Sequence, residues 1–298
     1  MTAASRPSEA FPTQQFGVGL HYGATDQSMG LVEVSKAAEE RGFDSMFVPE
    51  HTHIPTSRAT PYPGGGEIPG RYLRLWDPLV GLSFVAAQTN LVVGTCVCLP
   101  GEHDPIAMAK AVATLDVQSG GRFVMGVGFG WNNEEFEDHG FAAEHKRAVA
   151  IEKIKMMQQI WTHDEASFEG EHLSLSPSWS WPKPLQRPHP PVLLGGFATP
   201  VTLRRVADWA DGWIPMGMAP YTTLEKDLAV LKEHWEAGGR DPAALHVMVM
   251  QHAGTESFLR DVIAQYRELG VNRVLIDIPT EGPDVLLPLL DEVAPALT

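Results

Sequence analysis

The chain is poor in cysteine, in positive charge and in long apolar runs. Its 298 residues include 2 cysteines, and 22 lysines and arginines stand against 37 aspartates and glutamates, giving a formal net charge of -15. An acidic surface repels phosphate backbones and anionic lipids, so neither nucleic acid nor a membrane is an expected partner. No run of about 18 apolar residues occurs, so no transmembrane helix is predicted.

The two cysteines, Cys96 and Cys98, stand two residues apart in an apolar run. A pair at this spacing closes almost no loop, so a structural disulfide is not expected and the chain is typical of the reducing cytoplasm. Residues 1–15 are polar and contain two prolines. They are expected to form a flexible tail rather than a signal peptide, because they lack an apolar stretch.

From residue 16 to residue 298, short β-like runs alternate with longer helix-like runs. Helical spacing is clear, for example, at Leu224, Leu228, Leu231 and Trp235. Alternating β and α elements indicate a parallel sheet, and eight units allow it to close, which predicts an α/β fold with a single (β/α)8 TIM-barrel domain. The predicted strands are 16–20, 45–49, 91–98, 122–129, 192–196, 212–216, 246–251 and 273–278.

Two insertions interrupt this pattern, one after strand two and one before strand five. Residues 52–70 are rich in proline and glycine and too long for a simple connector, so we expect a wall or lid of the site. A long helix is predicted over 143–162. After it, residues 167–176 resemble a hairpin and 179–191 are rich in proline and tryptophan, and this second insertion is expected to pack over the barrel.

A closed barrel carries its site at the carboxyl ends of the strands. Strand two ends at Glu50 and His51, the best acid–base candidates, because histidine titrates near neutral pH and a carboxylate can orient it. Adjacent strand residues point to opposite faces, so a direct contact between the two is not implied. His51 and His53 also have the spacing of a metal-binding pair. At the later strand ends, only His252 and Asp277 can complete such a ligand set.

Glycines gather at two other strand ends. Gly126, Gly128 and Gly130 alternate, so they are predicted to share one face of strand four, where a flat ring can lie, although tight packing or a rim turn gives the same pattern. Their spacing is not the dinucleotide fingerprint. The pair Gly195–Gly196 precedes a helix starting near Thr199, whose N-terminus would either bind phosphate or simply be capped by that threonine.

Several segments together resemble the luciferase-like family of flavin- and deazaflavin-dependent enzymes. They are FDSMFVPEH at 43–51, TLD through SGGRF at 114–123, GVGFGW at 126–131, the proline-rich approach to the glycine pair at 182–196, and DGW at 211–213. The resemblance covers nearly the whole chain. It implies a barrel that holds coenzyme F420, a 5-deazaflavin that transfers hydride, or reduced FMN.

The resemblance also implies roles for single residues. His51 matches the family's active-site histidine, beside a carboxylate at Glu50. Thr95 and Cys96 match a position where members often carry a non-prolyl cis peptide and a bulge behind the flavin ring. The residues that match cofactor contacts after strand four and at the phosphate site are Gly128, Gly130, Asn132, Gly195, Gly196 and Thr199.

Phe129 departs from the bacterial luciferases, in which an arginine at this position helps to hold the flavin phosphate. The glycine pair after strand five also replaces a polar pair, and both changes favour the F420 branch. The predicted function is therefore an F420-dependent oxidoreductase that passes hydride between the deazaflavin and a small organic substrate, while His51 moves the proton. The substrate wall is predicted to contain His21, Trp76, Met216 and Gln251.

Three alternatives stay open at this point. They are an FMN-dependent monooxygenase that uses oxygen, a metal-dependent barrel hydrolase built on His51 and His53, and a non-catalytic flavin-binding or storage protein. Members of the family often dimerise through helices near strands two and three. The sequence shows no diagnostic patch there, so a homodimer is expected from the resemblance alone.

Overall fold

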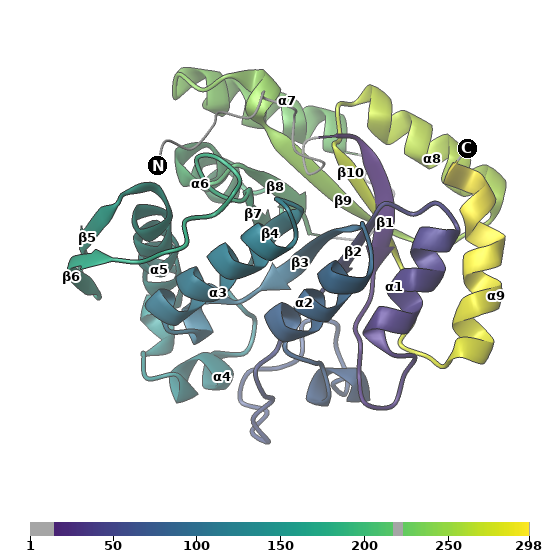
Figure 1. The fold of residues 1–298 in the computed structure, drawn as a ribbon, viewed down its shortest axis with the longest axis horizontal. Coiled ribbons are helices and arrows are strands. Elements are labelled where there is room, and N and C mark those ends of the chain that lie inside the picture. Colours follow the sequence, from purple (N-terminus) through teal and green to yellow (C-terminus); the bar gives the residue numbers. More distant parts are fainter. Residues whose placement is uncertain (1–14, 217–222, 298) are drawn as a thin grey trace.

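The computed structural model describes residues 15–216 and 223–297. Eight parallel strands form a closed barrel in the order β1-β10-β9-β8-β7-β4-β3-β2, and helices surround it (Figure 1). The predicted TIM barrel is confirmed, and the predicted strand ends lie within two residues of the observed ones. The barrel strands are β1 (Gly17–His21), β2 (Ser45–Val48), β3 (Val92–Cys98), β4 (Phe123–Val127), β7 (Val192–Gly196), β8 (Gly212–Pro215), β9 (His246–His252) and β10 (Arg273–Asp277).

The helices begin where simple capping rules place them. Asp77, Asp104 and Thr199 each accept a backbone N–H of the following helix, and each is followed by a proline in the first turn. The α-helices are α1 (Leu31–Glu40), α2 (Pro78–Gln88), α3 (Pro105–Gln118), α4 (Asn133–Asp138), α5 (Lys146–Thr162), α6 (Pro200–Trp209), α7 (Leu224–Ala237), α8 (Glu256–Glu268) and α9 (Pro283–Val293). Short 3-10 turns are η2 (Gly70–Leu73), η3 (Pro100–Glu102), η4 (Ala143–His145), η5 (Pro242–Ala244) and η6 (Ala294–Leu297).

The barrel interior is closed by a compact apolar cluster, while the opposite strand faces pack against the helices. Because side chains alternate along a strand, only every second residue belongs to the interior. A bulge in β3 between Thr95 and Cys98 breaks this alternation, so Cys96 and its neighbour Val97 both pack against the interior cluster. The fully buried members of that cluster are Phe47, Val92, Cys96, Val124, Leu193, Ile214, Met248 and Leu275.

Two segments differ from the prediction. The helix predicted over 143–162 begins as η4, and the separate short helix α4 precedes it. The proline-rich part of the second insertion packs at the amino end of the barrel, where Gln186 donates to the carbonyl oxygen of Phe123 at 2.8 Å. The antiparallel hairpin of β5 (Glu165–Glu169) and β6 (Ser174–Trp179) does not pack over the barrel. It lies beside α5 (Figure 1), because Glu152 of that helix accepts the backbone N–H groups of residues 171–173 at the hairpin turn.

Residues 1–14, 217–222 and 298 lie outside the described parts. The tail predicted over 1–15 falls outside them except for Gln15. Among the helices that the structure describes, none is long and apolar enough to cross a bilayer.

Candidate active site

The long connection between β2 and α2 and the short helix α4 lie together below the barrel in Figure 1. They meet at the carboxyl end of β2, where His51 follows the strand. His51 Nδ1 lies 2.7 Å from Glu135 Oε2, and Glu135 is 0% exposed. The second ring nitrogen, Nε2, accepts a hydrogen bond from the indole N–H of Trp131 at 3.2 Å.

These two partners fix the protonation of the ring. The indole N–H of Trp131 can only donate, so His51 Nε2 must accept, while the other oxygen of Glu135 accepts the backbone N–H of Thr52 at 3.0 Å. A neutral imidazole with one acceptor and one donor partner must carry its proton on Nδ1 and its lone pair on Nε2. Assigned in this way, His51 presents a base nitrogen that accepts its hydrogen bond from Trp131.

Glu50 does not hydrogen-bond His51, which agrees with the expectation that these adjacent residues point to opposite faces. Its Oε2 accepts the backbone N–H of Leu99 at 2.6 Å, and its Oε1 accepts from His103 Nε2 at 2.8 Å. Burial opposes a charge on His103, but the hydrogen bond and the charge of Glu50 outweigh it and raise the pKa of that ring. Side chains 50 and 51 leave the chain in opposite directions, and Glu50 holds the segment after β3 instead.

The true partner of His51 was missed because α4 was missed. Asn132 caps this helix by accepting the N–H groups of Glu134 and Glu135, and the buried Glu135 is the third residue after it. Asn-x-x-Glu resembles the capping box that often opens a helix, and this signal was present in the sequence. The cap uses the side-chain oxygen Oδ1 of Asn132, and this side chain is buried. Asn132 is therefore not positioned for the cofactor contact predicted for it.

A third acidic residue, Glu102, is buried next to this pair. Burial, followed by the negative charge of Glu135, raises the pKa of Glu102 to about 9, so this side chain is neutral near pH 7. Among the described residues its buried Oε1 has no hydrogen-bond partner. A protonated carboxyl beside a carboxylate needs no further donor, because its own O–H group can donate to that neighbour.

His21 ends β1 and binds two acceptors. Its Nδ1 lies 2.7 Å from Asp277 Oδ1, and its Nε2 lies 3.0 Å from the carbonyl oxygen of Cys96. Burial opposes ionisation of Asp277, but the hydrogen bond and the charge of His21 lower its pKa below the usual value. His21 thus joins the end of β10 to the backbone of β3. The predicted substrate-wall residue therefore fastens β1 to the bulge of β3.

The peptide bond between Cys96 and Val97 is cis, as the resemblance predicts, and it sits in the bulge of β3. The side chains predicted to bind a cofactor there are nevertheless turned inward. Thr95 is fully buried and donates to the carbonyl oxygen of Gly126 at 2.7 Å. Burial, with a smaller contribution from Asp277, raises the pKa of the Cys96 thiol to about 12, so thiolate chemistry at neutral pH is not expected.

The glycines after β4 do not all lie on one strand face. β4 ends at Val127, and Gly130 has a φ of +68°, so the chain turns away after the strand and that prediction is wrong for Gly128 and Gly130. Gly128 still borders the mouth, because a Cβ there would lie 2.7 Å from Val97 Cγ2. Side chains at Gly128 would therefore collide with Val97.

The glycine pair after β7 is divided between two environments. A Cβ on Gly195 would lie 2.9 Å from Val97 Cγ1 and 3.8 Å from Met216 Sδ, so this glycine faces the mouth. A Cβ on Gly196 would lie 2.9 Å from Thr202 Cγ2, so that glycine faces α6. Thr199 caps α6 by accepting the N–H of Thr202 at 3.1 Å, which bears out the simpler of its two predicted roles.

Two further substrate-wall predictions have different outcomes. Gln251 is buried, and its Oε1 accepts from the hydroxyl of Tyr266 on α8 at 3.4 Å. It thus faces the helix layer and not the mouth, because Met250 is the β9 residue that packs on the interior cluster. Trp76 remains partly exposed at the start of α2, at the end of the long connection.

The metal pair predicted from His51 and His53 does not converge. His53 Nε2 lies 3.0 Å from Asp138 Oδ2, whereas His51 is committed to Glu135. No group of three or more metal-type ligands occurs within residues 15–216 and 223–297. A metal-dependent hydrolase therefore has no ligand set in these parts of the chain.

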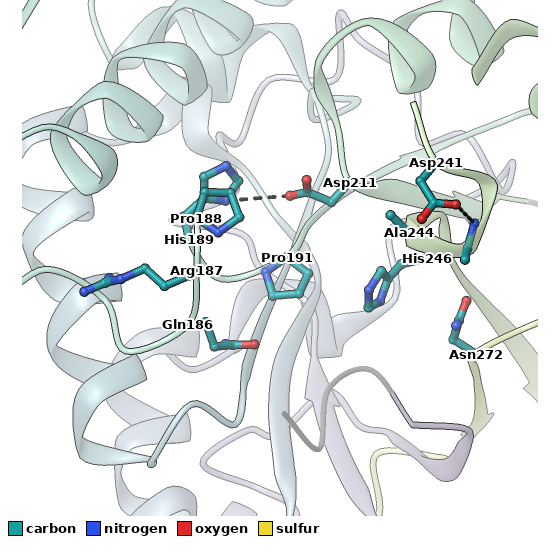
Figure 2. Close-up of a pocket in the computed structure, with 11 residues that line it drawn as sticks. Gln186, Arg187, Pro188, His189, Pro191, Asp211, Asp241, Ala244, His246 and Asn272 are labelled. Atoms are coloured by element: carbon teal, nitrogen blue, oxygen red, sulfur yellow. Dashed lines mark hydrogen bonds and ion pairs between the residues drawn. The ribbon is translucent and has the colours of Figure 1, made fainter. Parts of the chain in front are cut away.

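A cavity of about 500 Å³ lies at the other end of the barrel, where β7, β8 and β9 begin (Figure 2). His189, Asp211 and His246 line it, and Asp211 Oδ2 is 3.7 Å from His189 Nδ1. Burial lowers the pKa of His246, so its ring is neutral. Residues at the amino ends of barrel strands usually serve stability, so the candidate active site is the mouth with His51.

Comparison with known proteins agrees with this geometry. The sequence profile described as luciferase-like monooxygenase matches residues 11–272. An uncharacterized protein of Mycobacterium tuberculosis is 38% identical over 288 residues, which cover 93% of this chain and 99% of that protein. An F420-dependent glucose-6-phosphate dehydrogenase of Gordonia bronchialis is 31% identical over 226 residues, covering 74% and 62% of the two chains.

A flavin enzyme also matches part of the chain. An FMNH(2)-dependent dimethylsulfone monooxygenase of Pseudomonas putida is 35% identical over 132 residues, covering 43% of this chain and 36% of that enzyme. The named activities of these relatives are those of oxidoreductases.

Among solved structures, a monooxygenase from Streptomyces bottropensis shares the fold with a TM-score of 0.78 at 18% identity, covering 95% of this chain and 98% of that one. An F420-dependent secondary alcohol dehydrogenase, solved with an F420–acetone adduct, gives a TM-score of 0.73 at 18% identity, covering 95% and 99%. The barrel, the bulged third strand and the profile match lead to one assignment: the chain belongs to the luciferase-like monooxygenase family.

Proposed function

We propose that this protein is a coenzyme F420-dependent oxidoreductase that transfers hydride between the deazaflavin and a small organic substrate. The observation that carries the proposal is the floor of the barrel mouth. Val97 stands there at the bulge of β3, with Gly128 on one side and Gly195 on the other. A planar ring needs such a floor, because a bulkier side chain at either glycine would push Val97 into the space above.

A second feature fits the phosphate of the cofactor. Phe129 occupies the position of the luciferase arginine, but the guanidinium of Arg205 lies 5.8 Å from the centre of the Phe129 ring. Burial, together with the positive charge of Arg147, lowers the pKa of Arg205. Two arginines that repel each other favour an anion between them, and Arg205 lies on α6, the helix that follows the glycine pair. We infer that Arg205 takes over the role of the missing arginine.

The deazaflavin, when bound, supplies the hydride chemistry, and the protein supplies position and proton transfer. His51 Nε2 carries the lone pair that takes the substrate proton, and Trp131 must release that nitrogen when the substrate arrives. Glu135 stabilises the charged ring that results, from 2.7 Å away. In the reverse direction the same nitrogen returns the proton.

An FMN-dependent monooxygenase is the second candidate. The matching dimethylsulfone monooxygenase supports it, and so do the aromatic rings around His51, since Tyr72 and Trp131 both make edge contacts with it. Such a cover excludes water, which an oxygen-activating flavin requires. The dehydrogenase relative matches a larger share of this chain, 74% against 43%, and this favours F420.

The proposal is tested by titrating the purified protein with coenzyme F420 and, separately, with FMN, while the fluorescence of each cofactor is followed. We expect F420 to bind at least about tenfold more tightly, a difference of about 1.4 kcal/mol. Tight binding of FMN alone would replace the first candidate by the second. Failure of both cofactors to bind would reject the two together.

We also propose that the protein is a homodimer formed through α2 and α3. The outer face of α2 is apolar, with Val80 59% and Phe84 60% exposed. A cavity of about 520 Å³ lies between α2 and α3 and is lined mostly by apolar side chains. A helix that is apolar on all sides is normally covered, so a second copy of the chain is the expected cover.

A further inference from the structure

The site described above leaves one physical problem. A proton that His51 takes from a substrate must leave again, but the ring passes it inward to Glu135, which is 0% exposed. Glu135 therefore needs a neighbour that can carry the proton on. His51 itself has little contact with solvent, since its side chain is 6% exposed.

Glu102 is placed to be that neighbour. It ends η3, after the bulged strand, and its Oε2 lies 3.5 Å from Thr52 Oγ1, while the N–H of the same Thr52 binds Glu135. The Thr52 hydroxyl continues outward to His139 Nε2 at 2.9 Å, and that histidine is only partly buried. Glu135 and Glu102 thus share Thr52, and the hydroxyl of this residue leads from Glu102 towards the surface.

Glu102 also borders a separate cavity. This space of about 250 Å³ lies away from the mouth and is lined by Glu102, His103, Asp104, His139, Phe141 and Lys153, among others. It is polar and large enough for several water molecules. Glu102 is only 4% exposed, yet it contributes both to this wall and to the acidic pair with Glu135.

We propose that Glu102 is a proton-relay residue that connects the His51–Glu135 pair to the cavity lined by His103, His139 and Lys153. The inference rests on the proposed function, because the relay has a purpose when His51 takes up a proton during the reaction. Its experimental test does not depend on that function. It applies equally to a deazaflavin and to a flavin, because each requires a proton at the same histidine.

The relay balances as follows. A bound deazaflavin would accept the hydride with the two electrons of the substrate C–H bond that breaks, while the substrate O–H proton goes to His51 Nε2. The proton on Nδ1 moves to Glu135. Glu102 gives its own proton to water in the cavity and takes the one from Glu135. Glu135 and Glu102 are then as they began, and one proton has left the protein. His51 now carries its proton on Nε2 instead of Nδ1, and transfer in the reverse direction restores the starting tautomer.

The charges around Glu102 suit this role. Glu135 and Glu50 disfavour its ionised form, and burial does so more strongly, so it holds a proton at neutral pH. On the outer side lie the amines of Lys146 and Lys153. Burial lowers the pKa of Lys153 to about 8, although Asp104 and Glu102 work against this, so one neighbouring cation is itself easily neutralised. While they are protonated, the amines of Lys146 and Lys153 favour the transient ionised form of Glu102 from one side.

The experiment measures how fast the Nδ1 proton of His51 exchanges with water, using nitrogen-15-labelled histidine and NMR on the cofactor-free protein. Glu102→Gln keeps the size and a hydrogen-bond donor but cannot give up a proton. We expect exchange to slow at least about tenfold in this variant, in line with the loss of one acid–base group. Glu137→Gln, on the exposed side of α4, is the matched control and should exchange as the wild type does.

A second pair of variants tests the outward arm and guards against misfolding. Thr52→Val should slow exchange as well, whereas Thr52→Ser, which keeps the hydroxyl, should restore it. Infrared spectra at neutral pH should show a neutral carboxyl band that Glu102→Gln removes. Unchanged exchange in a folded Glu102→Gln protein, or absence of that band, would overturn the relay. Because no cofactor is present, this result is independent of whether F420 binds.

Discussion

Replacing Glu102 by glutamine is expected to remove a pH-dependent loss of stability. Buried in the fold, this carboxyl has a pKa of about 9, against 4.5 for the exposed group. Between these two values the folded chain holds a proton that the unfolded chain has released. The free energy of unfolding is therefore highest below the unfolded pKa and falls as pH rises towards the folded one, by about 1.4 kcal/mol per pH unit.

From about pH 6 to about pH 8 this amounts to about 2.7 kcal/mol in the wild type. Glutamine has no proton to lose, so the variant lacks this contribution. Urea unfolding of both proteins across that range gives the difference directly, because groups unaffected by the change cancel. Lys153, with its pKa lowered to about 8, acts mainly above this range. Parallel stability curves for the two proteins would refute the argument and place an ionised Glu102 in the core.

Three further variants test separate parts of the site. His51→Ala should retain F420 affinity but lose turnover by about 10²–10⁴-fold, measured with any alcohol that the wild type oxidises, and normal turnover would remove His51 from the mechanism. Arg205→Ala should weaken F420 binding and its salt dependence, whereas Arg204→Ala on the exposed side of α6 should not; equal effects would reject the phosphate role. Phe84→Glu should convert a dimer to a monomer in light scattering, and an unchanged mass would locate the interface elsewhere.

Much of the fold followed from the sequence because barrel strands have strong local signals. Apolar runs such as 192–196 are bounded by prolines and glycines, and the observed β7 has the predicted limits. The alternation of β and α elements then leaves few topologies. The bulge and cis peptide at Cys96 were also expected, but only through the resemblance, since nothing in the local composition requires them.

The candidate site was predicted less completely, because it depends on contacts between distant segments. His51 was found from its position after β2, but its partner Glu135 comes 84 residues later, on a helix too short to show periodicity. Gln251 was placed on the wrong side of β9 because the sequence does not tell which of two adjacent strand residues faces the interior. The contact of Arg205 with Phe129 joins two elements and had no sequence signal at all.

Equilibrium binding of coenzyme F420 to two matched variants tests the central claim most directly. Gly195→Ala adds a methyl group at the mouth that displaces Val97, whereas Ala244→Val narrows the cavity at the opposite end of the barrel (Figure 2). The account predicts that Gly195→Ala weakens binding at least about tenfold and that Ala244→Val leaves it unchanged. Loss of binding in Ala244→Val, with wild-type affinity in Gly195→Ala, would show that the cofactor does not lie on the floor formed by Val97 and its glycines.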